Sequence, residues 1–439
     1  MKKIFRWLTL SLLVLIFSFS AGCSFIAEEN GTAGSSQGAG DIANLPDSST
    51  LSESVQLTPK DTSEREALSI PDLIDMVEKT SVAITIDTAS SSSAGSGVLV
   101  DIDDGDDTND DTEFYIITCH HVVSGGGDIT VYVPDSQGRD YGDDGYDESF
   151  IFEGNIDNSK SNDGAISLVG GDKESDVAVL KLDISGSDIT ANDIVTAKIP
   201  AAGYQIREGE SVIAIGNPTG VLPGSVSVGT VGHIFRETSV NEVGKMTLMQ
   251  INVDIYQGSS GGGLYNVYGE LVGITNAGDT EHTGINFAIP LTITEGSGDK
   301  GFANIAAQLV ATANDENHGY VSGRWQLGVS VAESANRDGT SYVYVASVVE
   351  NGCCDKAGIQ KGDVISSLTF GDKEYSTNTL TKFSAAVDQM KAELTLGDVF
   401  TMHILRPTGS GFNVTYTATD VDVTLYQLIF CDTGVYPAA

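Results

Sequence analysis

Three kinds of side chain that together can carry out nucleophilic catalysis occur in one order along this chain. Two adjacent histidines, His120 and His121, follow an apolar segment and precede a glycine-rich turn; Asp176 opens the apolar segment SDVAVLKLD, and Ser260 lies in QGSSGGGL. A serine hydroxyl becomes a nucleophile when a histidine accepts its proton and a carboxylate orients that histidine. Each residue alone has a structural explanation, such as a turn serine or a solvated aspartate. Together, in the order His, Asp, Ser, they favour a hydrolase.

Short strands must position these residues. From Ser81 onward the chain contains many Val- and Ile-rich segments of about five to eight residues, separated by clusters of Gly, Asp and Ser. This pattern predicts a mainly β protein built as a barrel or sandwich. One helix is expected just before the first strand, because Ser69 suits an N-cap, Pro71 suits the first turn, and the apolar residues that follow have helical spacing.

Composition limits the classes of function. The chain has 439 residues, of which 40% are hydrophobic, which allows two or three domains with real cores. Its formal net charge is -38. Such a charge repels nucleic acid and anionic headgroups, so we expect no nucleic-acid partner. The acidity itself is typical of a soluble surface in an extracytoplasmic setting.

The N-terminus has the features of an export signal. Lys2, Lys3 and Arg6 precede an apolar run that ends near SAGC, residues 20–23. This resembles a bacterial lipobox, which implies that Cys23 is lipidated and becomes the first mature residue, although Ser20 replaces the preferred aliphatic residue. Ordinary signal cleavage and an uncleaved anchor remain alternatives. Residues 24–66 are rich in Ser, Gly, Thr and Asp and predict a disordered spacer.

Six segments, in order, resemble the HtrA/Deg family of trypsin-like serine proteases with a C-terminal PDZ domain. They are GSGVLVD (95–101), ITCHHVV, SDVAVLKL, AIGNPTG (214–220), GSSGGGL and GINFAIP (284–290). The resemblance implies a chymotrypsin-like double β-barrel followed by a PDZ domain, which is a small β-barrel with flanking helices. The expected division is a signal peptide over 1–22, a lipidated tether over 23–68, a protease domain over 69–310, a PDZ domain over 321–408 and a C-terminal tail over 409–439.

The family motif T-x-x-H-V-V decides between the histidines. Counted from Thr118, it places the general base at His121 and leaves His120 as a neighbour whose side chain points elsewhere. Asp176 then orients His121, and Ser260 is the nucleophile. The resemblance also implies an oxyanion hole at Gly258–Ser260, in which Ser259 replaces the asparagine of most relatives and the N–H groups of Gly258 and Ser260 donate.

Two further sites follow from the resemblance. The segment GITNAG predicts a specificity pocket at Ile274, Thr275 and Asn276, which suits a small or medium aliphatic P1 side chain. The segment GRWQLGV resembles a PDZ carboxylate-binding loop, in which main-chain N–H groups receive a peptide C-terminus. The expected peptide-binding residues are Gln326, Leu327, Gly328 and Val329. Trp325 replaces a glycine of many relatives, and a PDZ scaffold without a ligand is the alternative.

The function implied is that of an exported, membrane-tethered serine endopeptidase that degrades unfolded or damaged proteins without ATP, metal or cofactor. Its partners would be polypeptide substrates, C-terminal peptides, the membrane through a lipid anchor, and two further copies in a homotrimer. The implied location is the cell envelope, outside the cytoplasm. The alternatives are a signalling protease that cuts one membrane protein and a chaperone or peptide-binding adaptor; the complete triad argues against the adaptor.

Three features are left without an assigned role. The acidic segment 101–113 offers carboxylate oxygens, but it lacks the features of an EF-hand and reads as a solvated loop. The insertion 135–173 lengthens the interval between His121 and Asp176. Among the cysteines, Cys431 could pair with Cys353 or Cys354, and Cys119 is expected to be a small buried residue.

Overall fold

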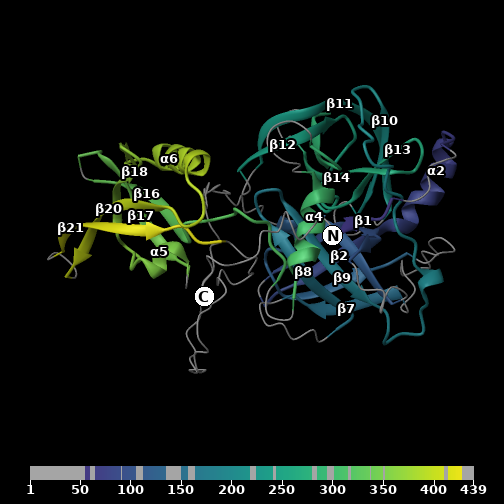
Figure 1. Ribbon diagram of the computed structural model, residues 1–439, viewed down its shortest axis with the longest axis horizontal. Helices are drawn as coiled ribbons and strands as arrows, with labels where there is room; N and C mark the ends of the chain where they lie inside the picture. The colour runs from purple at the N-terminus through teal and green to yellow at the C-terminus, as the bar shows by residue number, and fades with distance from the viewer. Residues whose placement is uncertain are drawn as a thin grey trace, which may run out of the picture.

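The structure is a computed structural model. It describes residues 55–59, 65–89, 91–104, 112–134, 150–156, 164–217, 224–240, 244–278, 284–293, 301–314, 318–336, 338–349, 352–409 and 414–427. The expected signal peptide, Cys23 and Cys431 lie outside these residues. Figure 1 shows a larger body that holds two barrels and a smaller body that holds the strands after β15.

The first barrel is closed and supplies the histidine and the aspartate. Its strand order is β2-β3-β5-β9-β8-β7-β6, and β2 pairs with both β3 and β6 to close it. The bounds are β2 Ser81–Asp87, β3 Ser92–Val100, β5 Glu113–Cys119, β6 Asp128–Tyr132, β7 Ile151–Asn155, β8 Ile166–Asp172 and β9 Val177–Asp183. Branched apolar side chains fill its interior, including Ile84, Leu99, Ile116 and Leu180, all fully buried. Such residues favour strands because they pack well on a pleated surface.

The second barrel is also closed and supplies the serine. Its order is β10-β11-β12-β15-β14-β13. The bounds are β10 Ser211–Gly216, β11 Ser225–Val240, β12 Gly244–Ile251, β13 Gly263–Asn266, β14 Leu271–Gly278 and β15 Asn286–Pro290. Two closed barrels in sequence confirm the chymotrypsin-like architecture. Closure also removes exposed strand edges, which would otherwise pair with other chains.

Short helices connect and cover the barrels. The predicted first helix is confirmed as α2, Ile70–Val77, where the Ser69 hydroxyl accepts a hydrogen bond from the N–H of Asp72 at 3.4 Å. The helix α3, His120–Val123, follows β5 directly, and α4, Phe302–Thr312, packs against β8 and β9. The short 3-10 turns are η2 Glu78–Thr80 and η4 Ala191–Asp193. No helix in the described part of the chain is long and apolar enough to cross a membrane.

The end of the predicted tether belongs to the folded protein, which corrects the boundary at residue 68. The strand β1, Gln56–Leu57, pairs with β4, Ile102–Asp103, and Leu57 is buried in the main core. Arg65 forms two hydrogen bonds to the buried carboxylate of Glu270, at 3.0 and 2.5 Å, and lies over the rings of Tyr204 and Tyr268. The chain is therefore fixed to the second barrel well before Ser69.

The smaller domain is built on a separate sheet and core. The order is β16-β17-β18-β20-β21, with β19 paired to β18, and the core includes Phe383, Met402 and Val423. The bounds are β16 Val329–Ala335, β17 Ser341–Val348, β18 Val364–Phe370, β19 Lys373–Ser376, β20 Val399–Thr408, β21 Thr415–Thr424, α5 Cys353–Lys356 and α6 Leu380–Glu393. The expected domain end at residue 408 was too early, because β21 pairs with β20 along its whole length and contributes to the core.

The connection between the domains is itself docked. The N–H of Gly319 donates to the carbonyl of Val169 at 2.7 Å, and Gly319 forms an isolated bridge with Gly170. The ring of His318 is 3.0 Å from the carbonyl oxygen of Leu168. Residues 318–319 thus lie against β8 before the chain enters the smaller domain.

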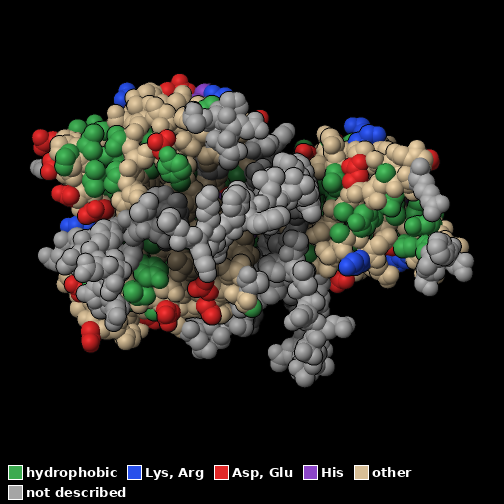
Figure 2. Space-filling view, turned by 180° about the vertical axis from the view of Figure 1, so that it is seen from behind, with side chains coloured by type: hydrophobic (Ala, Val, Ile, Leu, Met, Phe, Trp, Pro, Cys, Tyr) green, Lys and Arg blue, Asp and Glu red, His purple; other side chains and the backbone are tan. Residues whose placement is uncertain are grey.

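The surface agrees with the strong negative charge of the sequence. On the face seen in Figure 2, Asp and Glu side chains are spread over the barrels, while Lys and Arg occupy only a few places. The acidic side chains that this face presents would repel a polyanion.

Candidate active site

The two histidines lie at the start of α3 and have different surroundings. The ring nitrogen Nδ1 of His121 is 2.7 Å from Oδ2 of Asp176, and the main-chain N–H of His121 donates to Oδ1 of Asp176 at 2.8 Å. His120 contacts Asp176 through the main chain, because its N–H donates to the Asp176 carbonyl at 3.0 Å. The structure therefore pairs the imidazole of His121 with the carboxylate.

The protonation of His120 also sets it apart. Burial lowers the pKa of His120 to about 4, since desolvation disfavours the charged ring and outweighs the attraction of nearby carboxylates. His120 is thus neutral at pH 7. The side chain of His121, by contrast, remains 34% exposed, so that a substrate can reach its ring.

Asp176 is a buried carboxylate whose backbone conformation is strained. It is the one non-glycine residue with positive φ in the described part of the chain, at φ 54°, and it is fully buried. This left-handed conformation costs roughly 1–2 kcal/mol. Three hydrogen bonds to the carboxylate offset the cost: two come from His121, and the third comes from the side-chain amide of Asn276 at 2.6 Å. A carboxylate held by three hydrogen bonds is fixed in position.

Ser260 lies opposite, on the loop before β13. Its hydroxyl donates to the main-chain carbonyl of Asn276 at 3.0 Å, which is the only hydrogen bond that this hydroxyl makes among the described residues. The neighbouring glycines have positive φ, with Gly258 at 93° and Gly261 at 89°. A side chain at Gly261 would collide with the carbonyl oxygen of Ser96. The loop is therefore closely packed around the serine.

The predicted oxyanion donors are unpaired. The main-chain N–H groups of Gly258 and Ser260 donate no hydrogen bond to another described residue, whereas the N–H of Ser259 between them donates to the carbonyl of Tyr256 at 2.9 Å. Two donors with no internal partner are free to bind a negatively charged oxygen.

Ser96 on β3 holds the serine loop, a role that the sequence motifs did not predict. Its N–H donates to the Ser260 carbonyl and its hydroxyl donates to the Gly258 carbonyl, both at 2.8 Å. The same hydroxyl accepts from the N–H of Asn217 at 2.7 Å. The sequence did contain a signal, because glycines on both sides of Ser96 within a predicted strand indicate that another part of the chain packs closely there. In the structure, side chains at Gly95 or Gly97 would collide with core residues.

The predicted specificity-pocket residues occupy three different environments, so that the assignment needs correction. Ile274 is fully buried in the main core. The side chain of Asn276 faces Asp176, as described above. Only Thr275 borders a cavity, of about 410 Å³, which is lined by residues 214–216, 225–227 and 254–256 and by Ser259 and Thr275. In a strand, neighbouring side chains point to opposite faces, and three consecutive residues cannot line one pocket.

That cavity adjoins the serine loop and has both aliphatic and polar side chains in its lining. Ala214, Ile215, Val226 and Ile255 contribute aliphatic groups, and among the described residues of the lining only Asp254 is charged. Preference for an aliphatic P1 residue stays a prediction.

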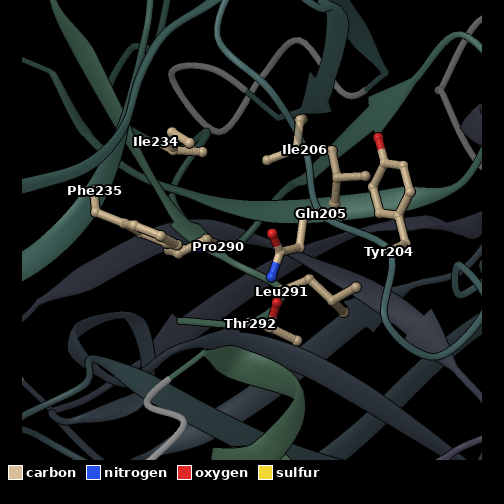
Figure 3. A pocket seen from close by; sticks show the side chains of 9 residues that line it. Tyr204, Gln205, Ile206, Ile234, Phe235, Pro290, Leu291 and Thr292 are labelled. Atoms are coloured by element: carbon tan, nitrogen blue, oxygen red, sulfur yellow. The ribbon is translucent and has the colours of Figure 1, made fainter. Parts of the chain in front are cut away.

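A second hollow lies away from the triad. Figure 3 shows it between Tyr204, Phe235, Pro290 and their neighbours. Its volume of about 30 Å³ is room for a single water molecule, so it is not a substrate site.

Cys119 lies beside the aspartate but is not a second nucleophile. Its thiol is fully buried and donates to the carbonyl of Thr275 at 3.4 Å, and burial raises its pKa well above the usual value. Sγ of Cys119 and the nearest ligand atoms of His121 and Asp176 lie within 4.8 Å of one another. A metal does not fit this group well, because the thiol is protonated and the Asp176 oxygens already accept three hydrogen bonds. Cys353 and Cys354 are also buried free thiols.

The predicted peptide-binding loop lies at one edge of the second sheet. Leu327 and Val329 are buried in the core of that domain, and Gln326 is partly exposed. The N–H groups of Leu327 and Gly328 donate no hydrogen bond to a described residue, and Gly328 has φ 70°. The strand β16 pairs only with β17 and has α6 next to it, so an edge is open to an added strand.

Comparisons with known proteins agree with this geometry. Residues 95–274 match the family model of the trypsin-like peptidase domain. The chain is 28% identical to the periplasmic serine endoprotease DegP of Escherichia coli (strain K12) over 313 residues, which cover 69% of this chain and 53% of DegP. It is 30% identical to the serine protease Do-like HtrB of Bacillus subtilis (strain 168) over 319 residues, which cover 68% and 57%. The chain thus spans little more than half of these relatives.

Among solved structures, it is similar to the serine endoprotease from Yersinia pestis. The two are 22% identical, with a TM-score of 0.41, and the match covers 82% of this chain and 98% of the other.

Proposed function

Because the chain belongs to the HtrA/Deg family of trypsin-like serine proteases, we propose that it is a serine endopeptidase that cleaves unfolded or damaged polypeptides through an acyl-enzyme. One observation carries the proposal. The pair formed by His121 and buried Asp176 lies at the same site as Ser260, since the amide of Asn276 contacts Asp176 while its carbonyl receives the Ser260 hydroxyl. The site therefore contains a base, an orienting carboxylate and a hydroxyl.

The first half of the reaction is acylation. Rotation of the Ser260 side chain away from the Asn276 carbonyl places its hydroxyl toward the ring nitrogen of His121 that does not face Asp176. His121 accepts the hydroxyl proton as the Ser260 oxygen bonds to the peptide carbonyl carbon, and the electron pair moves onto the carbonyl oxygen. When the intermediate collapses, the C–N bond breaks and His121 returns the proton to the leaving amine.

The second half is hydrolysis of the acyl-enzyme. Water gives a proton to His121, attacks the ester carbon and releases the new carboxylic acid, and Ser260 regains its proton. In both halves the N–H groups of Gly258 and Ser260 stabilise the negative oxygen. The Asp176 carboxylate holds the imidazolium in place, and the side chain of Asn276 acts on the reaction by positioning Asp176.

The remaining parts of the proposal concern partners and location. The edge of β16 that pairs with no described strand, and the N–H groups of Leu327 and Gly328, which donate to no described residue, support binding of peptide C-termini. Such binding would regulate the protease. Periplasmic relatives support an extracytoplasmic location. A lipid on Cys23 would hold the protein at the membrane, and a homotrimer is the proposed assembly.

Two experiments test the central claim. A fluorophosphonate probe should modify Ser260, as identified by peptide mapping, and the wild type should digest casein while Ser260→Ala does not. Equal digestion by both proteins, or by neither, would favour a peptide-binding module.

The membrane claim has its own test. Cys23→Ser should release the protein from the membrane fraction or block its processing, because no other anchor is proposed. Normal processing with unchanged membrane retention would rule out lipidation as the anchor.

A further inference from the structure

The turn that carries Asp176 forms ion pairs with side chains from outside the protease domain. It links β8 to β9, and Asp172 at its start closes it: the carboxylate of Asp172 accepts from the N–H of Ser175 at 3.0 Å and from its hydroxyl at 2.6 Å. The N–H of Asp176 donates to the carbonyl of Lys173 at 3.3 Å. This five-residue turn thus sets the direction in which Asp176 leaves it.

The other oxygen of Asp172 binds the smaller domain. Nε of Arg324 donates to Oδ1 of Asp172 at 3.0 Å, and Nη1 of Arg324 donates to Glu174 at 2.8 Å. Lys391 on α6 donates to the other oxygen of Glu174 at 2.5 Å. The side chains of Asp172 and Arg324 are 3% and 18% exposed, so this pair is largely shielded from water and depends on both partners.

The geometry points to Arg324 as a positioning residue for the catalytic aspartate, a role that rests on the proposed protease function. Asp176 holds a backbone angle that it would leave if the turn were free. By pairing with Asp172 and Glu174, Arg324 keeps the turn closed; with the arginine gone, Asp172 loses this partner and Glu174 keeps only Lys391 among the described residues. The turn then opens, and both the Asp176 carbonyl under His120 and its carboxylate under His121 lose their places.

The location of Arg324 gives this role a consequence. Arg324 immediately precedes Trp325 and the predicted peptide-binding loop, and Lys391 lies on the helix beside β16. The segment that leads into the predicted peptide-binding loop and the helix α6 therefore both contact the turn that holds Asp176. The smaller domain is part of the catalytic apparatus even before a peptide binds.

The test compares full-length variants on a short chromogenic peptide blocked at its C-terminus, so that it has no carboxylate for the smaller domain. Arg324→Ala should lower kcat about 10- to 100-fold, the scale expected from misplacing a catalytic group by about 1 Å, with KM changed less than about twofold. Arg324→Lys, which keeps the positive charge but lacks the two guanidinium nitrogens that bind Asp172 and Glu174, should recover part of the rate. The rate of fluorophosphonate labelling of Ser260 should fall in parallel with kcat.

Arg406→Ala is the matched control. Arg406 makes a similar two-bond pair with buried Asp363, but entirely within the smaller domain. It should lower the stability of that domain and leave kcat unchanged. Asp172→Asn provides a second disruption from the protease side if Arg324→Ala folds poorly, and it should reduce kcat in the same way.

Unchanged kcat in Arg324→Ala and Asp172→Asn, or an effect on KM alone, would overturn the positioning role. So would an equal loss in Arg406→Ala, which would show only that the smaller domain must be folded. If the wild type itself neither cleaves the peptide nor reacts at Ser260, the proposed protease function fails instead.

Discussion

The residues that the two barrels contribute to the site differ in whether they already contact their proposed catalytic partners. In the first barrel, His121 and Asp176 are already hydrogen-bonded, and the carboxylate is buried and fully engaged. In the second barrel, the Ser260 hydroxyl is directed to a main-chain carbonyl. The proposed base and its aspartate are thus already held together by hydrogen bonds, whereas the proposed nucleophile would have to rotate its side chain away from the Asn276 carbonyl. We therefore expect activity to depend on the packing around His121 and Asp176 and on the conformation of the loop that carries Ser260.

The largest expected effect comes from breaking the first half at its base. His121→Ala should lower kcat by several orders of magnitude, because the proton of Ser260 then has no acceptor. His120→Ala should keep most of the activity. Steady-state kinetics on one peptide will distinguish the two variants, and the reverse pattern would assign the base to His120.

Gly261→Ala should disrupt the loop that carries Ser260. Its φ of 89° disfavours any side chain, and the added carbon would collide with the Ser96 carbonyl, so we expect a destabilisation of about 3 kcal/mol or more and loss of fluorophosphonate labelling. Gly209→Ala is the matched control, because Gly209 has φ 85° but open space around it and should cost only about 1 kcal/mol. Equal losses in urea unfolding would show that the collision does not matter.

Asn276→Ala tests the residue that links the halves. Removing its amide takes one of three hydrogen bonds from the buried Asp176, and we expect kcat to fall by about 10-fold or more with little change in KM. Asn155→Ala removes a similar amide–carboxylate bond, to Asp128, on the surface and should leave kcat unchanged. A wild-type kcat in Asn276→Ala would show that His121 alone fixes the carboxylate.

The smallest effect concerns the pH dependence contributed by His120. Its folded pKa of about 4 lies below the ordinary value of 6.5, so the unfolded chain binds this proton first as pH falls. The stability of the wild type should therefore decrease through this window, and by about 2 kcal/mol more than that of His120→Gln between pH 7 and pH 5. Urea unfolding at the two pH values measures the difference. Parallel losses in both proteins would mean that His120 is solvated.

Sequence patterns and motifs predicted the features that depend on residues close together in the chain. Strand composition predicted a β-barrel or sandwich, the family resemblance predicted the two barrels, and the family motif counted from Thr118 selected His121 over its neighbour. The missed residues act across long separations: Ser96 contacts the loop at 258–260, Arg65 contacts Glu270, and Arg324 contacts Asp172. A single sequence gives no register between distant strands, and only the register brings such pairs together.

Composition also failed where a polar segment was held by a few specific contacts. Residues 55–59 and 65–68 belong to a segment whose composition predicts a spacer, yet the structure holds both pieces by specific contacts. Val55 and Leu57 are buried, and Arg65 binds Glu270 and lies over the rings of Tyr204 and Tyr268. The strand β21 has many polar residues and a mostly exposed surface, which concealed its place in the sheet.

The docking of Gly319 on β8 determines where this protein can be cut and rejoined. A side chain at Gly319 would collide with the Leu309 carbonyl, and one at Gly170 would collide with Gly319 itself, so the two glycines form a seam that accepts no other residue. A chimera that exchanges the smaller domain should therefore keep residues 318–320 with the barrels and join the new domain after them. A graft made before the seam would remove the contact of Gly319 with Gly170 on β8, only two residues from the turn that begins at Asp172.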